Sequence, residues 1–309
     1  MSTTSTLAIV GATASGKSEL AHRVALSYDN VEILCVDSMT VYRGMDIGTA
    51  KPSARERAEV RYHLLDLVEP SESFTVAEFQ RAARDVLDDI ASRGARALLV
   101  GGTGLYSRAV IDNFDIPGEY VQIRERLEGE ASDNLDDLYQ RLAALDPDAA
   151  AKMEPTNARR IVRALEVIEG SGRLFSSFGS PLTSYFSSPV PQIGLMPSLA
   201  DLDQRCEERL RRWVDEGLLD EVHRLVHLPG GWSVTAAQAV GYKEFVPAVC
   251  GESSREECLQ TAVTSTRQLI RRQIRWFRRD PRIDWHTTND SAMDAVVAWW
   301  GPTERSVRN

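Results

Sequence analysis

Residues 11–18 of this chain read Gly11-Ala12-Thr13-Ala14-Ser15-Gly16-Lys17-Ser18. They follow the apolar run 7–10 and precede residues 19–26, whose apolar side chains recur at helical spacing. A loop of the pattern G-x-x-x-x-G-K-[ST] between a strand and a helix points its backbone N–H groups at phosphate oxygens, and the helix dipole adds positive charge. Lys17 supplies a charge for the terminal phosphate, and the Ser18 hydroxyl is placed to bind Mg²⁺. The segment predicts a polyphosphate site but does not identify the polyphosphate.

Two further apolar runs predict buried strands that end next to polar or glycine-rich residues. Residues 33–36 end at Asp37, and residues 97–100 end at the turn 101–104. Strands that alternate with helices and read as continuous apolar runs form a parallel sheet with both faces covered. We therefore expect an α/β fold of the P-loop NTPase type, a parallel sheet flanked by helices. Ligands of such sheets bind at the carboxyl ends of the strands, where the loop 11–18 would meet the other two segments.

The alternation of strands and helices stops near residue 114. Residues 120–145 and 147–170 predict helices, the second region broken near Pro155-Thr156-Asn157. Residues 193–196 predict a strand that returns to the sheet. The chain is thus predicted to divide into a helical insertion domain and a P-loop core domain: residues 114–196, and residues 1–113 with 197–309.

The composition is that of a globular protein without membrane segments. The chain has 309 residues, 43% of them hydrophobic, and no apolar run is long enough to span a bilayer. Four scattered cysteines and an N-terminus without a basic region lead us to expect a cytoplasmic protein with no zinc or disulfide framework. The net charge of −9 would argue against a nucleic-acid partner, but the segment 267–279 holds six arginines and no acid. Net charge therefore decides nothing about partners.

Asp37 and Thr103 are the polar residues that the predicted fold places beside the phosphate-binding loop. The Asp37 carboxylate has three interpretations: a Mg²⁺ ligand through water, a general base, or a cap of the next turn. We favour the role of general base, because the Ser18 hydroxyl already provides a ligand for Mg²⁺. Thr103 lies in the segment Gly101–Tyr106, which is either a tight turn or a set of substrate ligands.

Arginines form two basic clusters. In the C-terminal helical stretch, Arg267, Arg271, Arg275 and Arg278 lie three or four residues apart and share one helix face. That face is either simply solvated or compensated by an anion, which could be a diphosphate, a nucleic-acid backbone or the acidic surface of this protein. A smaller cluster, 159–163, lies in the predicted insertion.

Six motifs occur in order along the chain: the loop 11–18, Asp37-Ser38 with the block 44–51, Gly101–Tyr106, Arg163–Val167, Gly241-Tyr242, and Thr266-Arg267-Gln268 continuing to Trp276. Together they resemble the bacterial tRNA dimethylallyltransferases, also called tRNA isopentenyltransferases. The resemblance extends from residue 7 to about residue 280. The block 44–51, Gly-Met-Asp-Ile-Gly-Thr-Ala-Lys, is far more specific than a P-loop alone.

The resemblance implies transfer of a dimethylallyl group from dimethylallyl diphosphate to N6 of an adenosine next to the anticodon of tRNA, with Mg²⁺ as cofactor. The P-loop would then hold a diphosphate leaving group rather than a nucleoside triphosphate. The implied partners are the tRNA anticodon stem-loop and the prenyl diphosphate, with no membrane and no obligate protein partner. We expect a monomer, because RNA would occupy the largest exposed groove.

The family pattern also assigns roles to residues of this chain. It implies a general base at Asp37 and catalytic roles for Lys17 and Thr103. The implied diphosphate ligands are residues 11–18, Arg271 and Arg275, with Ser18 on the metal. The implied tRNA contacts are Asp37, Ser38, Met39, Thr40, Thr103, Arg124, Arg159, Arg160, Ile161, Val162 and Arg163.

The chain departs from the family pattern at three places. Ala12 replaces the commoner proline, which changes the rigidity of the loop rather than its chemistry. Thr40 stands where glutamine is frequent, so base contacts there differ. Lys243-Glu244 follows Gly241-Tyr242 where Arg-Gln is common, which weakens the expectation of tRNA contacts at 238–243.

Three rival functions remain at the level of sequence. A small-molecule P-loop kinase would bind ATP in the same cradle, but it has no use for a tRNA-binding insertion. An isopentenyltransferase acting on free adenine nucleotides would not need the cluster 159–163 or the arginine-rich helix. A non-catalytic RNA-binding protein would not need Lys17, Ser18 and Asp37 together.

Overall fold

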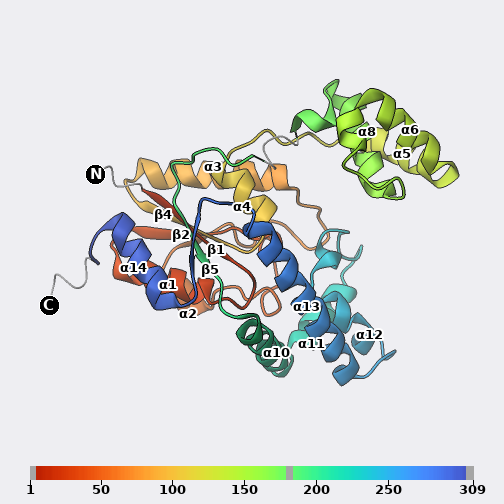
Figure 1. The fold of residues 1–309 in the computed structure, drawn as a ribbon. Helices are drawn as coiled ribbons and strands as arrows, with labels where there is room; N and C mark the ends of the chain where they lie inside the picture. The colour runs from red at the N-terminus through yellow and green to blue at the C-terminus, as the bar shows by residue number, and fades with distance from the viewer. Residues whose placement is uncertain (1–4, 179–183, 304–309) are drawn as a thin grey trace. The chain divides into compact units, whose positions relative to one another are not determined.

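The computed structural model describes residues 5–178 and 184–303, and this part of the chain contains a six-stranded sheet (Figure 1). Neighbouring strands are all parallel, in the order β3-β2-β4-β1-β5-β6. The strands are β1 (Thr6–Gly11), β2 (Val31–Cys35), β3 (Tyr62–His63), β4 (Arg96–Gly101), β5 (Gln192–Leu195) and β6 (Ile283–His286). The predicted α/β fold is confirmed.

Helices cover both faces of the sheet, as its continuous apolar strands require. The helices of this unit are α1 (Lys17–Ser27), α2 (Ala54–Glu59), α3 (Val76–Ser92), α4 (Gly104–Ile111), α10 (Leu199–Asp215), α11 (Leu218–Val226), α12 (Val246–Val249), α13 (Arg255–Phe277) and α14 (Asn289–Trp300). Two short 3₁₀ helices, Ala236–Gln238 and Lys243–Phe245, lie between α11 and α12.

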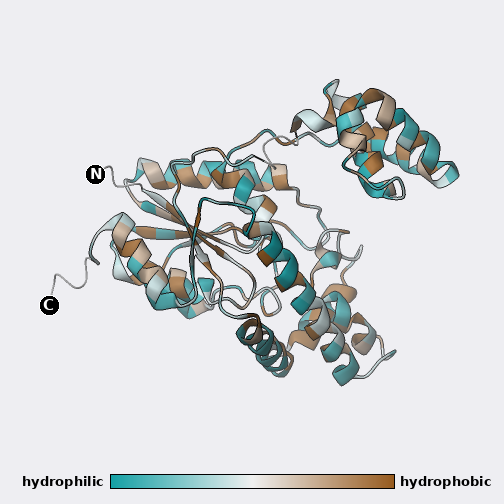
Figure 2. Cartoon of the chain, in the orientation of Figure 1, coloured by the Kyte–Doolittle hydropathy of each residue, from teal (hydrophilic) through white to brown (hydrophobic). Residues whose placement is uncertain are grey.

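The central strand β1 shows how the two faces divide. Leu7 and Ile9 pack with apolar residues of α1 and α14, whereas Ala8 and Val10 pack with those of α3, α10 and α13. These four side chains are at most 1% exposed. Figure 1 shows α1 and α14 next to each other on one side of the sheet and α3 on the other. In Figure 2, α3 carries both hydrophilic and hydrophobic stretches, as expected for a helix with one buried face.

The block 44–51 forms a loop that a buried carboxylate anchors. Glu221 of α11 is 2% exposed, and its Oε1 accepts the N–H groups of Asp46 at 3.0 Å and Ile47 at 3.1 Å. The same oxygen accepts the Tyr242 hydroxyl at 2.5 Å. A Cβ on Gly48 would lie 2.4 Å from the Tyr242 ring, so only glycine fits there. The loop is therefore held in one conformation by hydrogen bonds between residues 174 and 175 positions apart in the sequence.

A second compact unit comprises residues 112–186. Its helices are α5 (Val121–Asp133), α6 (Leu135–Leu145), α7 (Pro147–Ala150) and α8 (Ala158–Ser171). They enclose a core of their own that includes Leu127, Leu142 and Leu165. The sequence predicts one helical stretch over 120–145, but the chain breaks it at Asn134, whose side chain caps the start of α6.

The end of the insertion differs from the predicted boundary at residue 196. Residues 187–196 belong to the unit that contains the sheet, because β5 pairs with β1 on one side and β6 on the other. The Gly/Ser/Pro-rich stretch that precedes β5 falls partly on residues 179–183, which lie outside the described residues. Within residues 5–178 and 184–303, no helix combines the length and the apolar character needed to cross a membrane.

We expect Glu221→Ala to lower the free energy of unfolding by about 2–5 kcal/mol, because it leaves at least two partly buried N–H groups of the loop without an acceptor. Asp220→Ala, on the exposed side of the same helix, serves as the control and should change stability little. Urea denaturation followed by circular dichroism measures both. Equal stability of the two variants would show that the carboxylate does not anchor the loop.

Candidate active site

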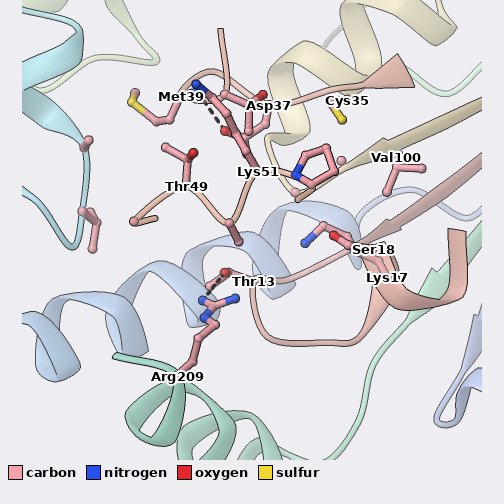
Figure 3. Close-up of a pocket in the computed structure, with 18 of the residues that line it drawn as sticks. Thr13, Lys17, Ser18, Cys35, Asp37, Met39, Thr49, Lys51, Val100 and Arg209 are labelled. Carbon is pink, nitrogen blue, oxygen red and sulfur yellow. Dashed lines mark hydrogen bonds between the residues drawn. The ribbon is translucent and has the colours of Figure 1, made fainter. Parts of the chain in front are cut away.

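A cavity of about 220 Å³ opens at the carboxyl edge of the sheet (Figure 3). It is lined by residues of the P-loop, the ends of β2 and β4, the loop 39–52, and helices α10 and α13. The structure thus brings the loop 11–18, Asp37 and the turn after β4 into one site. α13 contributes Thr266, Leu269 and Gln273 to the wall.

The P-loop has the geometry of a phosphate cradle. Gly16 has φ +95°, a left-handed conformation that glycine adopts at little cost, and it allows α1 to begin at Lys17. The first N–H groups of α1 therefore face the loop rather than other helical residues. The Ser15 hydroxyl is buried and has no hydrogen-bond partner in the described structure. These features favour an anion at the start of α1.

Lys17 is the first of two cations at the cradle. Its Nζ donates to the carbonyl oxygen of Ala12 at 3.2 Å, and no carboxylate of the described residues pairs with it. Burial lowers the pKa of Lys17 to about 8, with Asp37 opposing this effect and Arg209 adding to it. A bound anion would restore the ordinary pKa, because it would replace the water that the ammonium has lost.

Arg209 of α10 is the second cation, and no sequence motif marks it. Its Nη2 donates to the Thr13 hydroxyl at 2.6 Å, as Figure 3 shows, and its guanidinium lies 4.5 Å from the centre of the Trp213 ring. Its Nε is buried without a partner in the described structure, and burial lowers the pKa of Arg209 to about 10. The only signal in the sequence is its place between Cys206 and Trp213, beside the apolar stripe of α10.

Asp37 is held in place by two hydrogen bonds. The Met39 N–H donates to Oδ1 at 2.8 Å, and the Thr103 hydroxyl donates to Oδ2 at 3.2 Å. Thr103 in turn accepts the Ser38 N–H at 3.4 Å. The first bond is a turn cap, so the capping interpretation of Asp37 accounts for one oxygen only. Asp37 lines the cavity, whereas Thr103 does not line it and contacts the carboxylate through this hydrogen bond.

The specific block 44–51 ends in a lysine with a structural role. The Lys51 side chain is 1% exposed, and its Nζ donates to the Tyr42 carbonyl oxygen at 2.6 Å and to the carboxylates of Asp46 and Asp66 at 2.7 and 2.6 Å. Its three protons are therefore used within the loop. Lys51 lines the cavity wall without offering a charge to a ligand.

Arg271 and Arg275 do not line the cavity, contrary to the expectation that they bind the diphosphate. Both lie two residues from Gln273 on α13, and a two-residue step turns a helix by about 200°. They therefore face away from the site. Arg271 pairs with Asp203 of α10 at 2.9 Å, and Arg275 is exposed. The acidic surface of the protein itself, one of the three predicted anions, compensates Arg271.

The residues predicted to contact tRNA in the insertion fall into three groups. Ile161 and Val162 are 0% and 4% exposed and belong to the core of the unit, so their side chains do not reach a ligand. Arg124 and Arg163 pair with the buried Glu166, each at 2.9 Å. Arg159 and Arg160 are exposed, and neither side chain has a partner in the described residues. Of the remaining predicted contacts, Asp37, Met39 and Thr40 line the cavity, whereas Ser38 and Thr103 do not. Thr40 is 7% exposed, and its hydroxyl has no partner in the described structure.

The donors for a metal ion are few. The described residues contain no group of three or more His, Cys, Asp or Glu side chains that could hold one. The Ser18 hydroxyl lies exposed at the cavity. This donor set fits Mg²⁺, which keeps several waters and takes phosphate oxygens as its other ligands.

The fold and the site define a P-loop protein whose cradle is built for an anionic ligand. The chain belongs to the IPP transferase family, whose model matches residues 40–280. The family resemblance seen in the sequence motifs is thereby confirmed.

Individual relatives bear this out. The chain is 46% identical over 300 residues to the tRNA dimethylallyltransferase of Bifidobacterium animalis subsp. lactis, covering 94% of this chain and 85% of that protein. It is 45% identical over 291 residues to the tRNA dimethylallyltransferase of Salinispora tropica, covering 94% and 89%.

Solved structures give the same family. The tRNA isopentenylpyrophosphate transferase of Bacillus halodurans is 35% identical, with a TM-score of 0.68 over 98% of both chains. A eukaryotic dimethylallyltransferase, described as acting on tRNA, is 25% identical, with a TM-score of 0.79 over 95% of this chain and 78% of that one.

We expect the affinity for inorganic diphosphate to fall by about five-fold between pH 8 and pH 9, because free Lys17 loses its proton there and the anion binds the charged form. Calorimetric titration at a series of pH values measures this. Lys17→Met is the control, since it reports the titration of the ligand alone. Parallel pH profiles of the two proteins would contradict the assignment.

Arg209→Met should weaken the binding of inorganic diphosphate by about 10- to 100-fold, the effect of losing a charge-assisted hydrogen bond in a partly buried site. Methionine keeps the apolar contact with Trp213. Arg212→Met removes an exposed arginine from the same helix and should leave the affinity unchanged. If both variants bind diphosphate as the wild type does, Arg209 is not a ligand.

Proposed function

We propose that this protein transfers the dimethylallyl group of dimethylallyl diphosphate to N6 of an adenosine next to the anticodon of tRNA. One observation carries the proposal: Lys17 and Arg209 reach one cavity without a carboxylate partner among the described residues, and Asp37 lines the same cavity. The two cations can bind a diphosphate, and the carboxylate can accept a proton from the amine that displaces the diphosphate from carbon. Membership of the IPP transferase family supports both assignments.

The diphosphate leaving group would lie in the P-loop. Negative charge grows on it as the bond between carbon and oxygen breaks, and groups that are already oriented stabilise that charge without reorganisation. The N–H groups at the start of α1, the Lys17 ammonium and the Arg209 guanidinium are such groups. Ser18 and the diphosphate oxygens would hold Mg²⁺, which supplies further positive charge to the leaving group when it is bound.

Asp37 would accept the proton that the amine releases. The lone pair of adenine N6 is delocalised into the ring, so the amine is a weak nucleophile. A carboxylate that accepts an N6 proton as the new carbon–nitrogen bond forms makes the lone pair available. The Met39 N–H and the Thr103 hydroxyl orient the carboxylate, which is the role that we assign to Thr103.

The acceptor would be an extruded base of the anticodon loop. Chemistry on a base requires that the base leave its stack, and proteins recognise RNA loops with their bases splayed out. Arg159 and Arg160 of the insertion, exposed and without partners among the described residues, supply positive charge for the phosphates of the RNA. Thr40 would meet the base at the cavity.

The proposal is tested by incubating the protein with radiolabelled dimethylallyl diphosphate, Mg²⁺ and either unmodified tRNA or AMP, with ATP hydrolysis measured in parallel. Label in tRNA is the expected result. Label in AMP alone would assign the protein to free-nucleotide prenylation. Phosphoryl transfer without prenylation would identify a kinase, and binding of RNA without either reaction would identify a non-catalytic protein.

Asp37→Asn should reduce kcat by about 10²- to 10⁴-fold while tRNA affinity is retained, because the amide keeps the hydrogen-bonding shape but accepts no proton. Thr103→Val should reduce kcat by a smaller factor, because the carboxylate remains but loses one of its two donors. Single-turnover transfer and filter binding of tRNA measure the two quantities. Nearly intact turnover in Asp37→Asn would remove the general base from the mechanism.

A further inference from the structure

Gln273 of α13 bridges the P-loop and the turn after β4. Its Oε1 accepts the N–H of Thr13 at 2.9 Å, and its Nε2 donates to the carbonyl oxygen of Gly102 at 2.9 Å. The two partners decide the orientation of the amide, since a backbone N–H needs an acceptor and a carbonyl oxygen needs a donor. The side chain also lines the cavity. A long helix thus inserts one amide between two loops of the site.

The Gln273 amide, bonded to Thr13 and Gly102, forms a clamp that divides the N–H groups of the P-loop into two sets. Those of Ala14, Gly16, Lys17 and Ser18 make no hydrogen bond within the described residues and are free to meet an anion. The N–H of Ser15 donates to the Ala12 carbonyl oxygen at 3.3 Å. The N–H of Thr13 is occupied by Gln273, and the Thr13 hydroxyl by Arg209. Free donors therefore gather at the helix end of the loop, and Gln273 makes the Thr13 N–H unavailable to a ligand.

A phosphate chain longer than a diphosphate would continue toward the Thr13 end of the P-loop. In P-loops the backbone cradles two phosphates, and the lysine reaches toward the next. Here Lys17 Nζ is turned back to Ala12, and a Cβ placed on Gly102 would lie 3.3 Å from Lys17 Nζ and 3.1 Å from Gln273 Nε2. The Gln273 amide thus fills the space beside Lys17.

We propose that Gln273 determines the length of the phosphate chain that the cradle accepts, so that the site selects a diphosphate over a triphosphate. The inference rests on the proposed function, in which the ligand of the cradle is a diphosphate ester. A third phosphate would have to displace the amide from Thr13 and Gly102 and would break both hydrogen bonds. Diphosphate leaves the clamp intact. Gln273 is then a specificity-determining residue, and it excludes cellular nucleoside triphosphates from a loop that has their usual motif.

The test compares the binding of inorganic diphosphate and inorganic tripolyphosphate by calorimetry at one fixed Mg²⁺ concentration. The wild type should bind diphosphate at least about ten-fold more tightly than tripolyphosphate, because tripolyphosphate must break hydrogen bonds of a partly buried amide. Gln273→Ala frees the Thr13 N–H and the space beside Lys17. The preference for diphosphate over tripolyphosphate should therefore fall by about ten-fold or more. Gln260→Ala, exposed on the same helix, is the matched control and should keep the wild-type preference.

The variant Gln273→Met separates the effect of side-chain volume from the effect of the two hydrogen bonds. Methionine fills the space but releases the Thr13 N–H. The preference of this variant for diphosphate over tripolyphosphate should lie between those of the wild type and Gln273→Ala. A wild type that binds tripolyphosphate as tightly as diphosphate overturns the inference without any variant. So does an unchanged preference in a folded Gln273→Ala protein. Failure of the wild type to prenylate tRNA would remove the proposed function alone, because the preference for diphosphate is measured independently of transfer.

Discussion

The site depends on positive charge held near the P-loop without a carboxylate to neutralise it. Lys17 and Arg209 both have lowered pKa values because the protein removes water from them, and no described carboxylate pairs with either. A desolvated cation raises the free energy of the empty protein and lowers that of the complex with an anion. The same arrangement stabilises the departing diphosphate, so ligand binding and catalysis use one electrostatic feature.

The rest of the cavity supports this feature from distant parts of the chain. The parallel sheet brings the ends of β1, β2 and β4 to one edge, and α10 and α13 add Arg209 and Gln273 across it. Glu221 holds the loop that forms the opposite wall. Gln273 joins the P-loop to Gly102, next to the residue that orients Asp37. The phosphate cradle and the carboxylate are therefore parts of one hydrogen-bonded unit.

The sequence does not show which face of a helix points into the site, and the predictions that depended on this were wrong. The regular spacing of Arg271 and Arg275 predicts a shared face but not the direction in which it points, and that face pairs with Asp203 instead of the site. Arg209 is one of four arginines of α10, and no motif distinguishes it from the others. In the insertion, Ile161 and Val162 are among the implied tRNA contacts yet pack into the core, because a helix that contacts RNA also needs a buried face.

Local sequence patterns were enough to identify the glycine-rich loop with Lys17 and Ser18, the carboxylate at the end of β2, and the family to which the chain belongs. These are local patterns, in which neighbouring residues carry the whole requirement. The contacts of Arg209 and Gln273 with the P-loop became visible in the folded structure alone. Arg209 and Gln273 lie 196 and 260 residues from Thr13, and no local pattern records a contact that the packing of α10 and α13 creates.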